Sequence, residues 1–274
     1  MRTLLVSSWL VGCVIPADRE LDRQVLELEV TTEEAIDLVT RAGDLEVIGE
    51  PGRTTVQMEV TLVRFTDGPF SPSDAAGLNN LVATLESEGG QISAEAFVSI
   101  VGNNPFGTDV VLRVPADLDV AIEDDSGDIA VSELAGTVSI DDDSGDIVVA
   151  VVGAADINDD SGAIELLDVD GDVTINDDSG FVFVQNVMGT VDIIDQSGDI
   201  EVNGAGTTTI RDDSGAILVT TIEGDVDVVD DSGDIDVRDV TGVVSIDDDS
   251  GDIRVTNVGD FELRSDGSGS VTVN

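Results

Sequence analysis

Pairs of aspartates followed by serine and glycine recur at nearly constant spacing through the second half of the chain. The serines of successive copies lie 17 or 18 residues apart. The first aspartates of the eight full copies are Asp124, Asp142, Asp159, Asp177, Asp195, Asp212, Asp230 and Asp248. Carboxylates stacked at this spacing could bind Ca²⁺, which prefers oxygen ligands. Paired carboxylates are also the usual catalytic groups of glycoside hydrolases.

Three explanations of these aspartates remain open. Asp, Ser and Gly are all turn formers, so each copy could simply make a tight corner. However, like charges about 4.8 Å apart repel by about 0.9 kcal/mol per pair even in water. Bound Ca²⁺ would offset this repulsion, and a saline environment would screen it. The repeat is neither the glycine-rich Ca²⁺-binding nonapeptide nor an EF-hand loop, so the motif alone does not specify a metal.

The residues needed for catalysis are missing from the chain. It contains no histidine to act as a general base, all 11 of its basic residues are arginine, and the repeated serine has no activating partner in its motif. The acidic residues also follow the repeat, whereas catalytic residues usually break local rules. We therefore expect a protein that is not an enzyme.

The repeat itself predicts the architecture. A second glycine lies about halfway between successive copies, so each unit reads G-D-I-x-V-x-x-V-x-G-x-V-x-I-x-D-D-S. A fixed short period of this kind is typical of solenoids, and alternate apolar residues such as Ile147 and Val149, or Val138 and Ile140, should point inward from strands. The prediction is an all-β, two-sided β-solenoid, a β-helix-like rod with coils of about 18 residues, over 123–274.

Residues 28–122 are strand-rich but do not follow the repeat. Alternating stretches such as "VLELEV" and "TTVQMEVTLVRF" predict strands, and "SDAAGLNNLVATLE" predicts one short helix near 73–86. We expect this segment to be a β-rich N-terminal cap that covers the first open edge of the solenoid.

Composition limits the partners. The chain of 274 residues has a formal net charge of -48 and 41% hydrophobic residues, so it can bury a core despite its acidity. Nucleic acid is excluded as a partner by charge repulsion.

The single cysteine, Cys13, follows the short apolar run "TLLVSSWLVG". This pattern resembles a bacterial lipoprotein signal, with 1–12 as the signal peptide and 13–27 as a lipidated N-terminus and linker. An ordinary buried cysteine behind a short strand is the alternative. We expect an exported protein of the cell envelope that contacts the membrane through this N-terminal lipid anchor. In a Gram-negative source, the anchor would lie in the outer membrane.

One copy of the repeat carries aromatic residues. In "GFVFV", Val182 and Val184 keep the inward register, which directs Phe181 and Phe183 outward. The two rings could bind a glycan or a partner chain, although isolated apolar residues are common on protein surfaces.

The run "VPADLDVAIEDDSGDIAV" and the later "SGDI" copies resemble the adhesin family of bacterial envelope proteins with DUF4097-type β-strand repeats. The similarity covers roughly 28–274, and "SGAI" and "SGFV" depart from its pattern. The resemblance implies a β-solenoid at the cell surface or in the periplasm, with no defined catalytic residues. Two functions remain open: a structural or adhesive surface module, or a periplasmic interaction or envelope-sensing protein that docks a partner.

Overall fold

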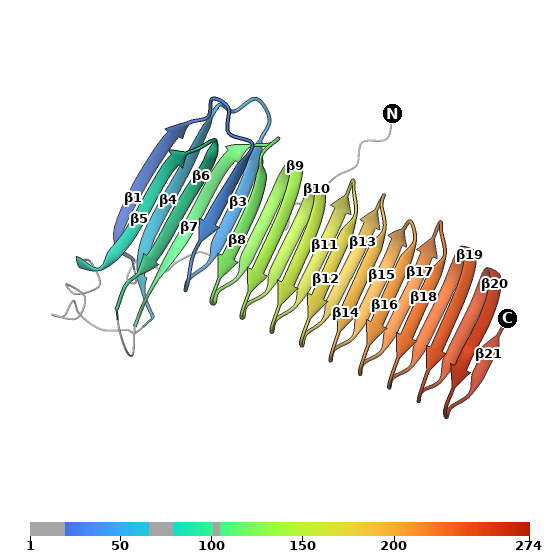
Figure 1. Ribbon diagram of the computed structural model, residues 1–274. Coiled ribbons are helices and arrows are strands. Elements are labelled where there is room, and N and C mark those ends of the chain that lie inside the picture. The colour runs from blue at the N-terminus through green and yellow to red at the C-terminus, as the bar shows by residue number, and fades with distance from the viewer. Residues whose placement is uncertain (1–19, 66–78, 101–104) are drawn as a thin grey trace.

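The computed structural model describes residues 20–65, 79–100 and 105–274. Within these ranges the chain is built from β-strands that form one long rod (Figure 1). The strands belong to a single sheet that folds around the rod, so that two hydrogen-bonded ladders run along its length. In the same ranges, no helix is long and apolar enough to cross a membrane.

The solenoid comprises about nine coils of 17 or 18 residues, as the repeat predicted. Four long strands pass through both ladders of a coil: β9 (Ile129–Asp142), β10 (Ile147–Asp159), β19 (Ile235–Asp248) and β20 (Ile253–Asp266). Between them the first ladder contains β11 (Ile164–Val169), β13 (Val182–Val187), β15 (Ile200–Ala205) and β17 (Ile217–Ile222), and it ends with β21 (Val271–Val273). The second contains β12 (Val173–Asp177), β14 (Val191–Asp195), β16 (Thr208–Asp212) and β18 (Val226–Asp230). Every pairing in this region is parallel.

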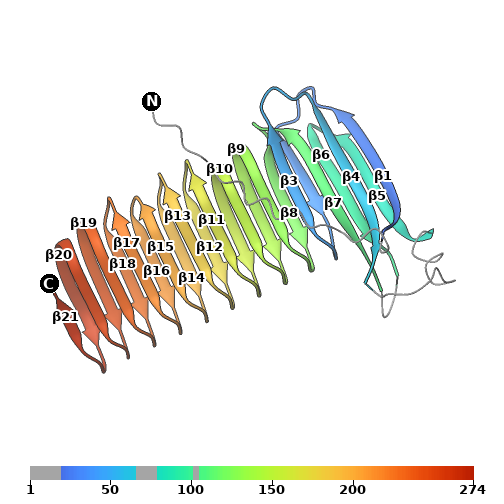
Figure 2. The same ribbon diagram turned by 180° about the vertical axis from the view of Figure 1, so that it is seen from behind.

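The N-terminal strands extend the same two ladders. The first ladder continues from β9 through β3 (Leu45–Glu50) and β7 (Phe106–Pro115) to the antiparallel β4 (Thr55–Arg64) and β1 (Glu20–Glu29). The second continues through β8 (Asp119–Asp124), β2 (Ala35–Val39) and β6 (Gln91–Val98) to the antiparallel β5 (Leu81–Glu88). Figure 2 shows these strands as a broader head at the end opposite β21. The exact division into segments at 27/28 and 122/123 stays a prediction.

The helix predicted at 73–86 is wrong over its second half. Residues 81–86 belong to β5, while 73–78 lie outside the described residues. The adjacent Gly89 and Gly90 both have positive φ, of 66° and 93°, which suits a two-residue hairpin turn. This turn pairs β5 with β6 in antiparallel register, and Leu81 and Leu85 pack against the core as strand residues.

The core is the interior of the coils. Inward residues predicted from the alternation, such as Ile147, Val149, Val138 and Ile140, are all fully buried. Each is stacked on its equivalents in the next coils by the parallel register. β-Branched side chains dominate because they pack well on a pleated surface.

Candidate functional site

The first aspartates of the DDSG copies form one row along the rod, which we call the inner row. Its members are Asp124, Asp142, Asp159, Asp177, Asp195, Asp212, Asp230 and Asp248. Each pairs in register with the next along the second ladder. The structure therefore brings all eight predicted residues together. It also buries them, with 0 to 3% of each residue exposed, which the sequence analysis did not anticipate.

Each inner-row carboxylate from Asp142 to Asp248 uses one oxygen in its own corner. Asp177 is representative: its Oδ1 accepts a hydrogen bond from the Ser179 backbone N–H at 3.1 Å. The equivalent distances in the other six corners are 3.0 to 3.3 Å. The second oxygen, Oδ2, is buried and has no partner among the described residues in any of these seven corners. One half of each carboxylate shapes the turn, and the other half is left without a donor.

Burial makes these carboxyl groups weaker acids than an exposed aspartate. Desolvation is the largest cause in every case, and it raises the pKa of Asp142, Asp177 and Asp230 to about 7. It raises the pKa of Asp124, Asp159 and Asp212 to about 6. The pKa values of Asp195 and Asp248 also lie above the usual range for the same reason. Neighbouring carboxylates add to the increase, while the serine N–H groups oppose it.

The second aspartates of the motif form an outer row at the surface. Its members are Asp125, Asp143, Asp160, Asp178, Asp213, Asp231 and Asp249, with Gln196 in the remaining coil. Gln196 donates from Nε2 to Asp178 Oδ1. The backbone carbonyl of Asp143 accepts a hydrogen bond from Ser161 Oγ in the next coil, and most of the other motif serines make the equivalent contact. The serine hydroxyls thus join successive coils, and none of these contacts would activate them as nucleophiles.

A third acidic row, missed as a group by the sequence analysis, follows the motif glycine. Asp146 Oδ1 accepts the backbone N–H of Ala163 in the next coil at 3.0 Å. The same contact is made by Asp128, Asp199, Asp234 and Asp252. The aspartate of "SGDI" is therefore a backbone acceptor between coils. The repeat of that four-residue string was the signal that could have revealed it.

The predicted Ca²⁺ site at the inner row stays a prediction. Among residues 20–65, 79–100 and 105–274, no group of three or more acidic side chains is arranged closely enough to hold a metal ion. The inner-row oxygens are also shielded from solvent, whereas a hydrated cation would first meet the exposed outer row.

Phe181 and Phe183 lie on the outer surface of the first ladder, as the alternation predicted. Phe181 is 44% exposed and Phe183 is half-buried. Their rings stack at a centroid distance of 6.3 Å and an interplanar angle of 16°. Phe183 lies in register between Glu165 and Glu201 of the neighbouring coils. The pair, with Ala163, Ile164 and the two glutamates, lines a shallow depression. We call this the aromatic patch; whether it binds a partner is untested.

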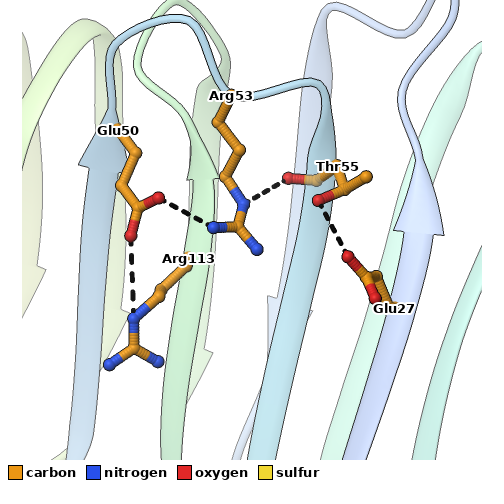
Figure 3. A network of polar contacts seen from close by, with 5 residues as sticks. All are labelled: Glu27, Glu50, Arg53, Thr55 and Arg113. Carbon is orange, nitrogen blue, oxygen red and sulfur yellow. Dashed lines mark hydrogen bonds and ion pairs between the residues drawn. The ribbon is translucent and has the colours of Figure 1, made fainter.

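Basic side chains of the N-terminal head balance some of its acids. Arg53 donates to Glu50 Oε2 at 2.7 Å and to the Thr55 carbonyl at 2.7 Å (Figure 3). Arg113 Nε lies 3.7 Å from the other oxygen of Glu50, and Thr55 bonds to Glu27. No ion pair within the described residues involves an inner-row carboxylate. Cys13, the predicted lipidation site, lies outside these residues.

The fold and the three rows of aspartates together define an acidic β-solenoid of parallel strands, in which the same polar contacts recur from coil to coil. The family model described as Toastrack DUF4097 matches residues 79–273. The chain therefore belongs to the DUF4097 family, as its repeat had indicated.

Two solved structures place this family membership in context. A "putative adhesin" from Parabacteroides distasonis has a TM-score of 0.51 at 15% identity, with 92% of this chain and 97% of that chain covered. A "putative lipid binding protein" from the same species has a TM-score of 0.48 at 17% identity, with 92% and 96% covered. At this identity the first similarity supports the fold alone. A search of curated proteins found no match.

Proposed function

We propose that the chain is a non-catalytic, lipid-anchored acidic β-solenoid of the bacterial envelope that acts as a structural or adhesive surface module. The observation that carries this proposal is the role of the repeated polar side chains. Inner-row aspartates bond their own corner, serines bond the preceding coil, and "SGDI" aspartates bond the following coil. These groups build a rod, and the faces between them remain free to contact a partner.

The anchor assigned to this rod is a lipid on Cys13. Its support is the "LVGC" sequence after a short apolar run. If the source is Gram-negative, the anchor lies in the outer membrane. Acylation of one end would leave a long rod extending from the membrane, a geometry that suits contact with other cells. One of the two similar Parabacteroides distasonis proteins is named an adhesin, which agrees with this class of function.

We assign the contact site of the rod to the aromatic patch. The partner that we assign to this patch is a protein segment that contains arginine. Phe181 is 44% exposed, and Glu165 and Glu201 lie in register on either side of Phe183. A guanidinium can stack on an aromatic face while pairing with a carboxylate. The charge of -48 attracts such a segment and repels anionic partners. A neutral glycan would gain nothing from this charge.

A binding comparison tests the patch separately from the overall charge. An arginine-containing peptide is titrated into the purified chain at 150 mM NaCl, where long-range attraction is screened over about 8 Å. Phe181→Ser with Phe183→Ser should weaken binding at least about tenfold, whereas Val243→Ser, at an exposed residue of β19 outside the patch, should not. Equal binding by all three proteins would eliminate the patch.

Cell adhesion tests the function itself. Cells that lack the chain should detach more readily from one another and from protein-coated glass than cells that produce it. Unchanged adhesion after deletion would reject the adhesive function. The alternative, a periplasmic interaction or envelope-sensing protein that docks a partner, would then be preferred.

A further inference from the structure

The unpartnered oxygens of the inner row recur too regularly to be an accident of one corner. Seven consecutive coils each bury an Oδ2 without a hydrogen-bond donor among the described residues. An ionised carboxylate is expensive to bury unless its oxygens are hydrogen-bonded or paired with a positive charge. Each of these oxygens therefore requires a hydrogen-bond donor or a positive charge, and the requirement recurs once in every coil.

The groups around the row are acidic rather than basic. The charges of Asp124 and Asp159 raise the pKa of Asp142, and those of Asp212 and Asp248 raise the pKa of Asp230. All of these residues belong to the inner row. The outer row adds further carboxylates, among them Asp160 beside Asp159. The remaining acidic neighbours are Asp146, Asp234 and, at the C-terminal end, Asp266. Arg41 pairs with Asp125 of the outer row, and among the described residues no ion pair reaches an inner-row carboxylate. A cationic side chain is therefore not what compensates the row.

The register offers a different solution. Asp177 is directly paired with Asp159 on one side and Asp195 on the other, one coil of about 4.8 Å away in each direction. A carboxylic acid carries an O–H donor, whereas a carboxylate has only acceptors. A proton on one member would let its free oxygen donate toward the next carboxylate in the stack. Hydrogen bonds between an O–H and a carboxylate are short and strong.

We propose that the inner row is a row of proton-binding sites, in which neighbouring buried aspartates share one proton through carboxyl–carboxylate hydrogen bonds. The rod therefore binds protons when it folds. It is more stable in mildly acidic water than at alkaline pH, the reverse of ordinary acid denaturation. This inference concerns the interior of the solenoid and is independent of the proposed adhesive function.

The direction of the pH effect follows from the shifts already described. The ordinary aspartate pKa of 3.8 is raised throughout the row, and it reaches about 6 or 7 in Asp124, Asp142, Asp159, Asp177, Asp212 and Asp230. Between these values the folded state binds more protons than the unfolded state, so stability falls as pH rises. The stabilisation is complete below pH 3.8 and is lost as pH passes through 6 to 7. Because coupled groups titrate together, the row should show shared apparent pKa values.

A pair of adjacent substitutions provides the test. Asp177→Asn replaces an inner-row carboxylate by a neutral group that can still accept from Ser179 N–H and can also donate to its neighbours, as a protonated aspartate would. Asp178→Asn removes the same charge from the exposed outer row, one residue away. The apparent melting temperature of each purified chain is measured by circular dichroism from pH 5 to pH 8, in EDTA at constant ionic strength.

The wild-type melting temperature should fall by about 5 °C or more between pH 5 and pH 8. Asp177→Asn should raise it at pH 8 and reduce its pH dependence. Asp178→Asn should reduce the pH dependence much less, because the Asp178 charge is only a minor cause of the raised pKa of Asp195. A melting temperature that rises with pH, or equal effects of the two variants, would overturn the proposal. So would a stabilisation at pH 8 by Ca²⁺ but not by Mg²⁺ that Asp177→Asn abolishes, because the row would then be a metal site.

A measurement without substitutions guards against a variant that fails to fold. Carbon-13 NMR of the aspartate carboxyl groups in the wild-type chain should show a subset that titrates near pH 6 to 7, separate from the exposed aspartates. If every carboxyl group titrates near pH 4, the row holds no protons at neutral pH and the proposal is wrong.

Discussion

Gly180 lies directly on Gly162 of the preceding coil: a Cβ on Gly180 would be 1.6 Å from the Gly162 carbonyl oxygen. The same close approach recurs at the motif glycine of every coil from Gly145 to Gly269, at 1.6 to 1.9 Å. Backbones that approach so closely leave no room for any side chain. The glycine of DDSG is therefore fixed by contact between coils as well as by the turn.

We expect Gly180→Ala to force the coils apart and to lower the free energy of unfolding by at least about 3 kcal/mol. Gly89→Ala is the control for positive φ without contact, since Gly89 has φ of 66°, against 157° at Gly180, and nothing lies within 4 Å of its added Cβ. It should cost only about 1 kcal/mol. Chemical denaturation of both variants measures the difference. Equal losses would mean that backbone conformation, rather than contact between coils, selects glycine.

The "SGDI" aspartate should stabilise the rod through its hydrogen bond to the next coil. Asp146→Ala removes the acceptor of the Ala163 N–H, which should cost about 1 kcal/mol in spite of reduced charge repulsion. Asp146→Asn keeps a carbonyl oxygen and should remain close to wild type. Asp143→Ala is the control, because within the described residues only the backbone of Asp143 is hydrogen-bonded. Thermal unfolding should rank Asp146→Ala below the other two variants, and a reversed order would count against this role.

Val151 offers a stabilising substitution. This β-branched residue has φ of 59° at a corner where Asn186 and Asn257 occupy the equivalent positions of later coils. Left-handed backbone costs an L-residue about 1–2 kcal/mol, and asparagine tolerates it better than valine does. Val151→Asn should therefore raise stability by about 1 kcal/mol.

The control for this substitution is Val148→Asn, at an exposed residue of the same strand that lacks positive φ. It should be neutral or destabilising because asparagine is a poor strand former. Denaturation midpoints compare the two. A loss of stability in Val151→Asn would show that the strain at this corner is negligible.

Much of the rod could be predicted because the sequence itself shows both the 17- or 18-residue repeat and the alternation of apolar and polar residues along each strand. Val138 and Ile140 alternate inward, and the same alternation continues two residues further to Asp142. The burial of the inner row was therefore present in the pattern. It was missed because two adjacent aspartates conceal which one keeps the inward position, and because a charged residue is expected outside.

Other features had no comparable signal. The corners with positive φ carry Glu133, Val151, Asp168 and Thr221 as well as asparagine and glycine, so no residue type marks them. The strand β5 was mistaken for a helix because Leu81 and Leu85, four residues apart, would share one face of a helix as well as one face of a strand. Its pairing with β6 across the Gly89–Gly90 turn decided the outcome.

Display of the rod outside the cell is the central functional claim, and protease treatment of whole cells tests it most directly. Intact cells are incubated with a protease that cannot cross the outer membrane, and the chain is followed with an antibody, beside a periplasmic protein that reports leakage. If the rod is displayed at the surface, the chain is cleaved while the periplasmic protein stays whole. Protection of the chain until the outer membrane is opened would contradict surface display and would place the rod in the periplasm.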